Sequence, residues 1–139
     1  MQPTVSAAEA SQRVQQLVEE AFAQLPPGAS LVFNDGSDVG PCEGAMQGRV
    51  FAEKRYRIVV EPGSDWPADR AIPTLVAFWE KAGYQLHDDR RQERWPRYVV
   101  RTPDDFSVNI AGWDRGDHFD YTLTSSSPCV WENGTPNPG

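Results

Sequence analysis

The stretches Gly40-Pro41-Cys42 and Ser127-Pro128-Cys129 contain the only two cysteines of this 139-residue chain. Each cysteine follows a proline and lies at the expected end of a strand. A disulfide requires Cα atoms within about 7 Å of each other. A bond between these cysteines therefore predicts that the first and last strand regions meet in space. Two buried free thiols are the alternative that the residues leave open.

Length and composition indicate one soluble domain. A chain of 139 residues with 39% hydrophobic and 24% charged residues can bury a core without metal or several disulfides. The net charge of −7 argues against nucleic acid as a partner, because phosphate binding needs a basic excess. No apolar run approaches the roughly 18 residues of a membrane span, and no signal-peptide pattern follows Met1. We expect one domain over residues 1–130 and a flexible tail over residues 131–139.

Two amphipathic helices are predicted. The first begins at Ser6-Ala7-Ala8-Glu9, which fits a capping box, and ends before Pro26-Pro27-Gly28. The second follows the loop 62–67 and ends at Gly83, a residue suited to a left-handed cap. Its apolar stripe consists of Ile72, Leu75, Val76, Trp79 and Ala82.

Six strands are predicted from alternating apolar and polar residues. They cover residues 30–33, 49–61, 84–88, 97–102, 106–111 and 119–124. The turn-forming residues 34–38 are expected to end the first strand, with a loop from there through Cys42 to Gly48. The order is therefore α-β-β-α-β-β-β-β. This order predicts an α+β fold, with two helices packed on one face of a mostly antiparallel sheet and a polar sheet face opposite.

Both cysteine stretches resemble those of a known group of proteins. Val39-Gly40-Pro41-Cys42 followed by Arg49-Val50-Phe51, and the closing stretch Ser126 to Trp131, resemble small exported actinobacterial proteins, the LppA-like lipoproteins of mycobacteria and their relatives. The resemblance implies export, a disulfide, and a lipid anchor on an upstream cysteine that this sequence does not contain. It implies no catalytic residues.

No pattern predicts a metal, a cofactor or a catalytic centre. His87 and His118 lack zinc-ligand spacing, and the acidic clusters 34–38 and 114–120 are read as turns because they lack the spacing of a calcium loop. Ser37 does not occupy the central position of a nucleophile elbow. Adjacent carboxylates such as Asp88 and Asp89 point to opposite faces of a strand. We expect a protein that is not an enzyme; a hydrolase with its site on the strand-end loops is the enzymatic alternative.

The candidate binding surface combines the polar sheet face with tryptophans at element ends. Its residues are Arg97, Arg101, Asn109, Thr122, Thr124, Trp66, Trp95 and Trp113. Solvation explains a polar sheet face without a ligand, and tryptophans at element ends can simply cover the rim of the core. The functional interpretation is a set of aromatic anchors beside a basic strip formed by Arg90, Arg91, Arg94, Arg97 and Arg101.

The expected function is therefore a non-enzymatic, extracytoplasmic binding domain, the soluble part of an actinobacterial lipoprotein. Its expected partner is a protein or an envelope glycan or polymer, with peripheral membrane attachment through a lipid anchor. The disulfide favours this location, because cysteine pairs are oxidised mainly outside the cytoplasm. The alternative is a cytosolic immunity or inhibitor protein that binds a partner protein through the polar sheet face.

Overall fold

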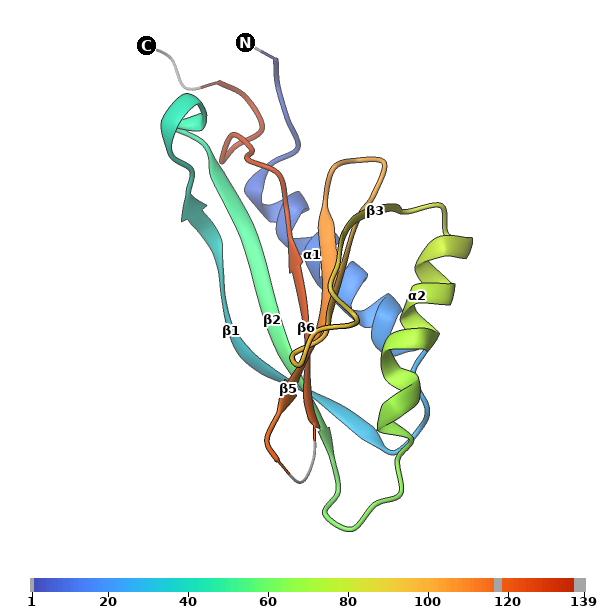
Figure 1. Ribbon diagram of the computed structural model, residues 1–139. Coiled ribbons are helices and arrows are strands. Elements are labelled where there is room, and N and C mark those ends of the chain that lie inside the picture. The colour runs from blue at the N-terminus through green and yellow to red at the C-terminus, as the bar shows by residue number, and fades with distance from the viewer. Residues whose placement is uncertain (1, 117–118, 137–139) are drawn as a thin grey trace.

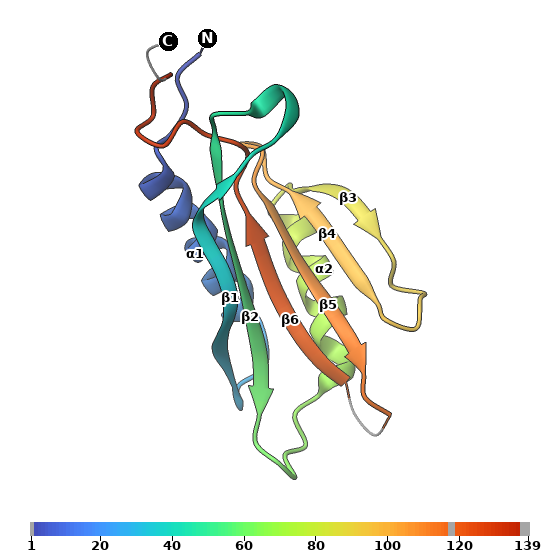
Figure 2. The same cartoon turned by 90° about the vertical axis from the view of Figure 1, so that its left-hand side faces the viewer.

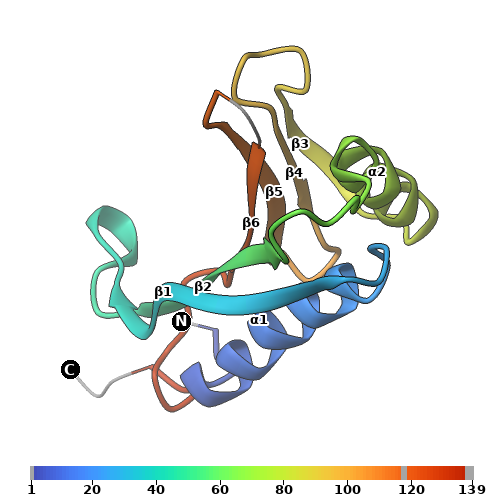
Figure 3. The same cartoon turned by 90° about the horizontal axis from the view of Figure 1, so that it is seen from below.

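The computed structural model describes residues 2–116 and 119–136. Two helices cover one face of a six-stranded antiparallel sheet and leave the other face open (Figures 1 and 3). The elements are α1 (Ala7–Phe22), β1 (Ala29–Pro41), β2 (Val50–Val60), α2 (Ala71–Lys81), β3 (Gln85–Asp89), β4 (Arg97–Arg101), β5 (Ser107–Asp114) and β6 (Phe119–Ser126). Short 3₁₀ helices span Gly44–Met46 and Ala68–Arg70. The predicted α+β class is confirmed.

The strands are ordered β1-β2-β6-β5-β4-β3 across the sheet (Figure 2). Hairpin neighbours explain most of the pairs, but the pairing of β2 with β6 joins the two halves of the chain. In that pair Tyr56 lies opposite Leu123. The pairing brings the chain after β6 alongside the start of β2, where Val130 and Val50 form an isolated antiparallel bridge.

Strand β1 is much longer than predicted. The expected turn at residues 34–38 is wrong, because the chain remains extended from Ala29 to Pro41. Two register shifts, between Phe33 and Asp35 and again before Gly40, absorb the turn-forming residues as irregularities in the pairing with β2. Gly36 is needed there, since a Cβ atom at this position would lie 2.3 Å from the carbonyl oxygen of Glu53. Backbone pairing with β2 therefore overrides the local preference for a turn.

Helix α1 forms as its sequence predicts. The side chain of Ser6 accepts a hydrogen bond from the Glu9 amide at 3.2 Å, and the Glu9 carboxylate accepts one from the Ser6 amide at 3.0 Å. This capping box satisfies two amides that would otherwise lack partners. The apolar face of the helix is buried against the sheet through Ala10, Val14, Leu17, Val18 and Ala21.

Helix α2 is docked mainly by one aromatic residue. Trp79 is 1% exposed, and its ring stacks on Tyr98 of β4 with centroids 6.2 Å apart and planes 4° apart. Leu75 and Ile72 extend the buried stripe along the same side of the helix. Gly83 follows the helix with φ of 82°, as a left-handed cap requires.

The two cysteines are bonded. Cys42 and Cys129 form a disulfide with their Cα atoms 6.3 Å apart, across a sequence separation of 87 residues. Cys42 lies just beyond β1, and its amide donates to the carbonyl of Arg49 at 3.1 Å. The bond therefore joins the edge strand β1 to the segment that follows β6.

The first residues of the tail expected over residues 131–139 contact the N-terminal segment. Trp131 is 5% exposed, and its indole donates to the carbonyl of Gln2 at 3.2 Å. The amide of Thr4 donates to the carbonyl of Gly134, so residues 2–7 and 131–134 run side by side (Figure 1). Residues 137–139 lie outside the described residues.

An ion pair connects α1 with the turn between β4 and β5. Arg13 Nε lies 3.3 Å from Asp104 Oδ2. Burial of Asp104 acts to raise its pKa, but hydrogen bonds from Thr102 and Arg13 outweigh burial, so the pKa lies below its usual value. A lowered folded-state pKa means that the charged form stabilises the fold above the unfolded pKa of about 3.9 and loses this effect as the pH falls through the folded value.

We therefore expect Asp104→Asn to lower the free energy of unfolding at pH 7 by about 1 kcal/mol or less, since the pair is partly exposed. The difference from the parent protein should shrink as the pH falls through the lowered pKa of Asp104 and disappear once this carboxyl is protonated in the folded protein. Urea denaturation at several pH values measures both effects. A difference that stayed constant down to the acid limit would contradict this account.

Candidate functional site

The sheet face opposite the helices is organised in three rows of side chains. Antiparallel pairing aligns alternate residues of four neighbouring strands. From β2 across β6 and β5 to β4, the rows read Arg57–Thr122–Ala111–Arg97, Arg55–Thr124–Asn109–Val99 and Glu53–Ser126–Ser107–Arg101. Long side chains stand mostly on the two outer strands, and short ones on the two inner strands.

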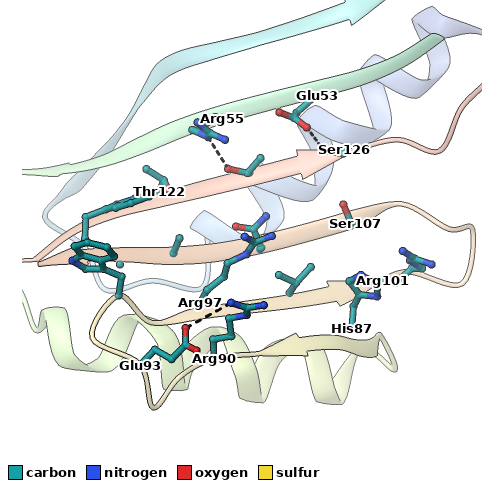
Figure 4. A pocket seen from close by; sticks show the side chains of 17 residues that line it. Glu53, Arg55, His87, Arg90, Glu93, Arg97, Arg101, Ser107, Thr122 and Ser126 are labelled. Atoms are coloured by element: carbon teal, nitrogen blue, oxygen red, sulfur yellow. Dashed lines mark hydrogen bonds and ion pairs between the residues drawn. The ribbon is translucent and has the colours of Figure 1, made fainter. Parts of the chain in front are cut away.

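This arrangement makes a trough rather than a flat face (Figure 4). Its floor consists of the short side chains of β5 and β6, namely Ser107, Asn109, Ala111, Thr122, Thr124 and Ser126. Its walls are the arginines of β2 and β4, namely Arg55, Arg57, Arg97 and Arg101. We call this feature the arginine-walled trough. It encloses about 520 Å³, and three strand spacings set its walls roughly 14 Å apart.

Two tryptophans stand at one end of the trough. Trp95 precedes β4 and Trp113 lies near the end of β5, one row beyond Arg97 and Ala111. Their ring centroids are 6.3 Å apart with a tilt of 40°. They remain 53% and 41% exposed, so both present apolar surface to solvent beside the trough.

The trough is positively charged on an acidic protein. Arg55, Arg90, Arg97 and Arg101 line the 520 Å³ hollow together with Glu53 and Glu93, an excess of two positive charges where the whole chain carries −7. Both glutamates are engaged: Glu53 accepts a hydrogen bond from the Ser126 hydroxyl at 2.8 Å, and Glu93 lies 3.9 Å from Arg90. The open sheet face therefore carries a local positive excess at this hollow.

The arginines of the trough walls differ in their hydrogen-bond and ion-pair partners. Arg55 donates to Thr124 Oγ1 at 3.4 Å and lies 3.7 Å from Asp35. Arg101 lies 3.5 Å from Asp105. Within the described residues, the guanidinium of Arg97 makes no hydrogen bond or ion pair. Its donors are directed to solvent at the trough wall, so they are available to an anion.

The predicted candidate surface is largely brought together. Arg97, Arg101, Asn109, Thr122, Thr124, Trp95 and Trp113 all line the hollow. Trp66 does not: it packs against the core, and its indole donates to the carbonyl of Pro26 at 2.9 Å. That bond gives Trp66 a role in the loop after α1, away from the open face.

The predicted basic strip is divided by the structure. Arg90, Arg97 and Arg101 line the hollow. The guanidinium of Arg91 instead donates a hydrogen bond to the Asp89 carboxylate at 2.7 Å. It also lies over the ring of Tyr98, which stacks on Trp79 of α2, so Arg91 is on the helix side of β4. The remaining member, Arg94, lies beside the tryptophan pair.

Several lining residues were absent from the predicted site. Arg55, Glu53 and the flanking Arg57 come from β2, and His87 comes from β3. The sequence of β2 alternates in a way that predicts Arg55 and Arg57 on its polar side. The missing information was that β2 pairs with β6, which makes β2 a wall of the trough.

The described residues contain no group of three or more His, Cys, Asp or Glu side chains that could hold a metal ion. His118 and Asp117, which the sequence predicts to lie in a turn, are outside the described residues. No helix in the described part of the chain has both the length and the apolar character that a membrane crossing requires.

Comparisons of this chain with models of protein families, with curated proteins and with solved structures gave no match.

Proposed function

We propose that this chain is a non-enzymatic binding domain that works outside the cytoplasm and holds an anionic partner in the arginine-walled trough. The observation that carries the proposal is the alignment of arginine walls around a floor of short hydroxyl and amide side chains. Such a floor leaves room for a ligand, and the walls supply charge at both sides of it.

The chemistry of the trough suits binding. Guanidinium groups stay protonated at all physiological pH values and present planar sets of donors that match carboxylate and phosphate oxygens. The floor adds neutral hydroxyl and amide groups, which can form hydrogen bonds with polar ligand groups whatever the charge of the ligand. The enclosed volume is within the ~300–1,000 Å³ typical of ligand sites.

The extracytoplasmic location is supported by the disulfide. Bonds of this kind form and persist in oxidising compartments. A lipid anchor on a cysteine upstream of this chain, as in LppA-like lipoproteins, would hold the trough at the cell envelope. Protein prepared without reductant should contain no free thiol for a maleimide reagent to label in denaturant. Labelling of both cysteines would count against this location.

The charge of the trough can be compared with what the alternative function, an immunity or inhibitor protein, would require. An acidic protein suits a basic target through its overall charge. The open sheet face, however, carries a positive excess, which complements an acidic partner. A basic target is therefore a poor electrostatic match for this face.

The proposal predicts that two wall arginines act together. We expect the double variant Arg55→Gln/Arg97→Gln to weaken binding of short anionic oligomers by tenfold or more, roughly what the loss of one or two charge-assisted hydrogen bonds implies. Titration calorimetry at low salt, with tetragalacturonate and tetraglutamate as probes, measures the change.

A matched control removes the same charge elsewhere. Arg70 and Lys81 are exposed on the helix side of the molecule. The variant Arg70→Gln/Lys81→Gln should bind the probes as the parent protein does. Equal weakening in both double variants would show that only net charge matters, and the trough would then not be the site.

A further inference from the structure

The tryptophan pair at the end of the trough is built as a fixed platform. Trp113 and Trp95 face each other across the β4–β5 hairpin, where the amide of Gly112 donates to the carbonyl of Pro96 at 2.8 Å. That bond continues the pairing of the two strands by one more step. Strand pairing therefore holds the backbone of Trp113 and of Pro96, the residue that follows Trp95.

A second contact holds the platform from outside. The guanidinium carbon of Arg94 lies 5.6 Å from the centre of the Trp95 ring, and Arg94 Nε lies 3.4 Å from Asp114 Oδ2. The carboxylate of Asp114 also accepts a hydrogen bond from the Gly116 amide at 2.8 Å. This hydrogen bond, and to a smaller extent the hydrogen bond and positive charge of Arg94, keep the pKa of Asp114 below its usual value. The pair connects the turn before β4 to the end of β5. Both rings nevertheless stay substantially exposed, which is costly for a surface without a partner.

Arg97 stands directly beside this platform. It is two residues after Trp95 on the same face, and it lies opposite Ala111, whose small side chain leaves the floor open. Its guanidinium has no partner among the described residues, whereas Arg94 and Arg101 are each paired with an aspartate. A flat apolar surface and an available set of charged donors therefore lie next to each other.

From this juxtaposition we infer that the end of the trough is a subsite for an anionic saccharide, a sugar ring that carries a carboxylate or a phosphate. The inference rests on the proposed function and narrows its partner to this class. The C–H faces of a sugar ring pack on the electron-rich faces of Trp95 and Trp113, and the ring's oxyanion binds Arg97. Neighbouring hydroxyl groups then reach Asn109 and Thr122 on the floor.

An acidic peptide fits this end of the trough less well. Its carboxylates would satisfy the arginines, but flexible aliphatic side chains do not need two tilted indole rings fixed beside the charge. A neutral saccharide would use the rings and leave the Arg97 donors unused. Only a ligand with both features uses every group that the structure places there.

The test uses four probes and the indole N–H signals in ¹H–¹⁵N spectra of the whole chain. The probes are tetragalacturonate, glucose 6-phosphate, the neutral cellotetraose and the non-sugar anion tetraglutamate. We expect one or both anionic sugars to bind, to shift the signals of Trp95 and Trp113, and to bind more tightly than the other two probes. Which of the two binds tells whether the oxyanion is a carboxylate or a phosphate.

Single substitutions test which side chains of the subsite contribute to sugar binding. We expect Arg97→Gln and Trp113→Ala each to weaken sugar binding by about tenfold. Trp95→Ala serves as a second platform variant if Trp113→Ala proves unstable. Arg70→Gln and Phe33→Ala, which remove an exposed arginine and an exposed aromatic ring from elsewhere on the surface, should leave binding unchanged.

Three outcomes would overturn the inference. If tetraglutamate binds as tightly as tetragalacturonate and Trp113→Ala has no effect, the partner is an acidic chain without sugar, and the proposed function stands. If cellotetraose binds as tightly as the anionic sugars and Arg97→Gln has no effect, the charge of the ligand plays no part. If no probe binds, the proposed function fails together with the inference.

Discussion

Protein in which Cys42 and Cys129 are both replaced by serine should melt roughly 10–20 °C below the parent protein. The disulfide spans 87 residues of sequence, and closing a loop of that length removes enough disorder from the unfolded chain to contribute about 4–5 kcal/mol in the chain-entropy model. That amount is a large part of the stability of a typical domain. Thermal unfolding followed by circular dichroism measures the shift.

The same experiment contains its own control. Reductant should lower the melting temperature of the parent protein toward that of the double variant, and it should leave the double variant unchanged. Hydrogen exchange should show the earliest loss of protection near Cys42 and Trp131, because these segments lie beside the bond. A double variant that melts with the parent protein would show that the bond adds nothing to stability.

The second large effect is expected from Trp79→Ala, which should cost about 3–5 kcal/mol. Trp79 is buried between α2 and the sheet and stacks on Tyr98. Truncation leaves a cavity the size of an indole ring and removes the main contact that holds an 11-residue helix, too short to persist without packing. Chemical denaturation of the disulfide-bonded protein measures the loss.

Two further variants sharpen this prediction. Trp79→Phe keeps an aromatic ring against Tyr98 and should cost less than the alanine variant. Trp113→Ala removes an equally large but exposed side chain and should change stability by much less, which also shows that its effect on sugar binding is not unfolding. A cost below about 1 kcal/mol for Trp79→Ala would contradict the role assigned to this residue.

Local sequence signals predicted the elements well where neighbours in the chain determine the structure. The capping box at Ser6 and Glu9 fixed the start of α1, and Gly83 marked the end of α2. Strand β5 alternates buried and less buried residues as its sequence predicts. Each of these features depends on contacts within a few residues, which periodicity and capping patterns record.

Long-range pairing explains what the sequence could not predict. Residues 34–38 have the composition of a turn, yet pairing with β2 keeps them extended. The trough depends on the same kind of information. Alternation placed Arg97 and Thr122 on the polar face, but only the β2–β6 and β4–β5 registers bring Arg55 and Arg57 opposite them across a floor of short side chains. The binding surface could therefore be predicted in part and its hollow shape could not.

The register shifts in β1 have a consequence for the behaviour of the protein at high concentration. Both edge strands of the sheet are irregular, since β3 also has a shift between Leu86 and Asp88. An edge with evenly spaced free amides and carbonyls is a template on which another molecule can add a strand. Bulges interrupt that spacing, so the exposed apolar side chains Val32, Phe33 and Leu86 lie on edges that resist intermolecular strand addition and aggregation.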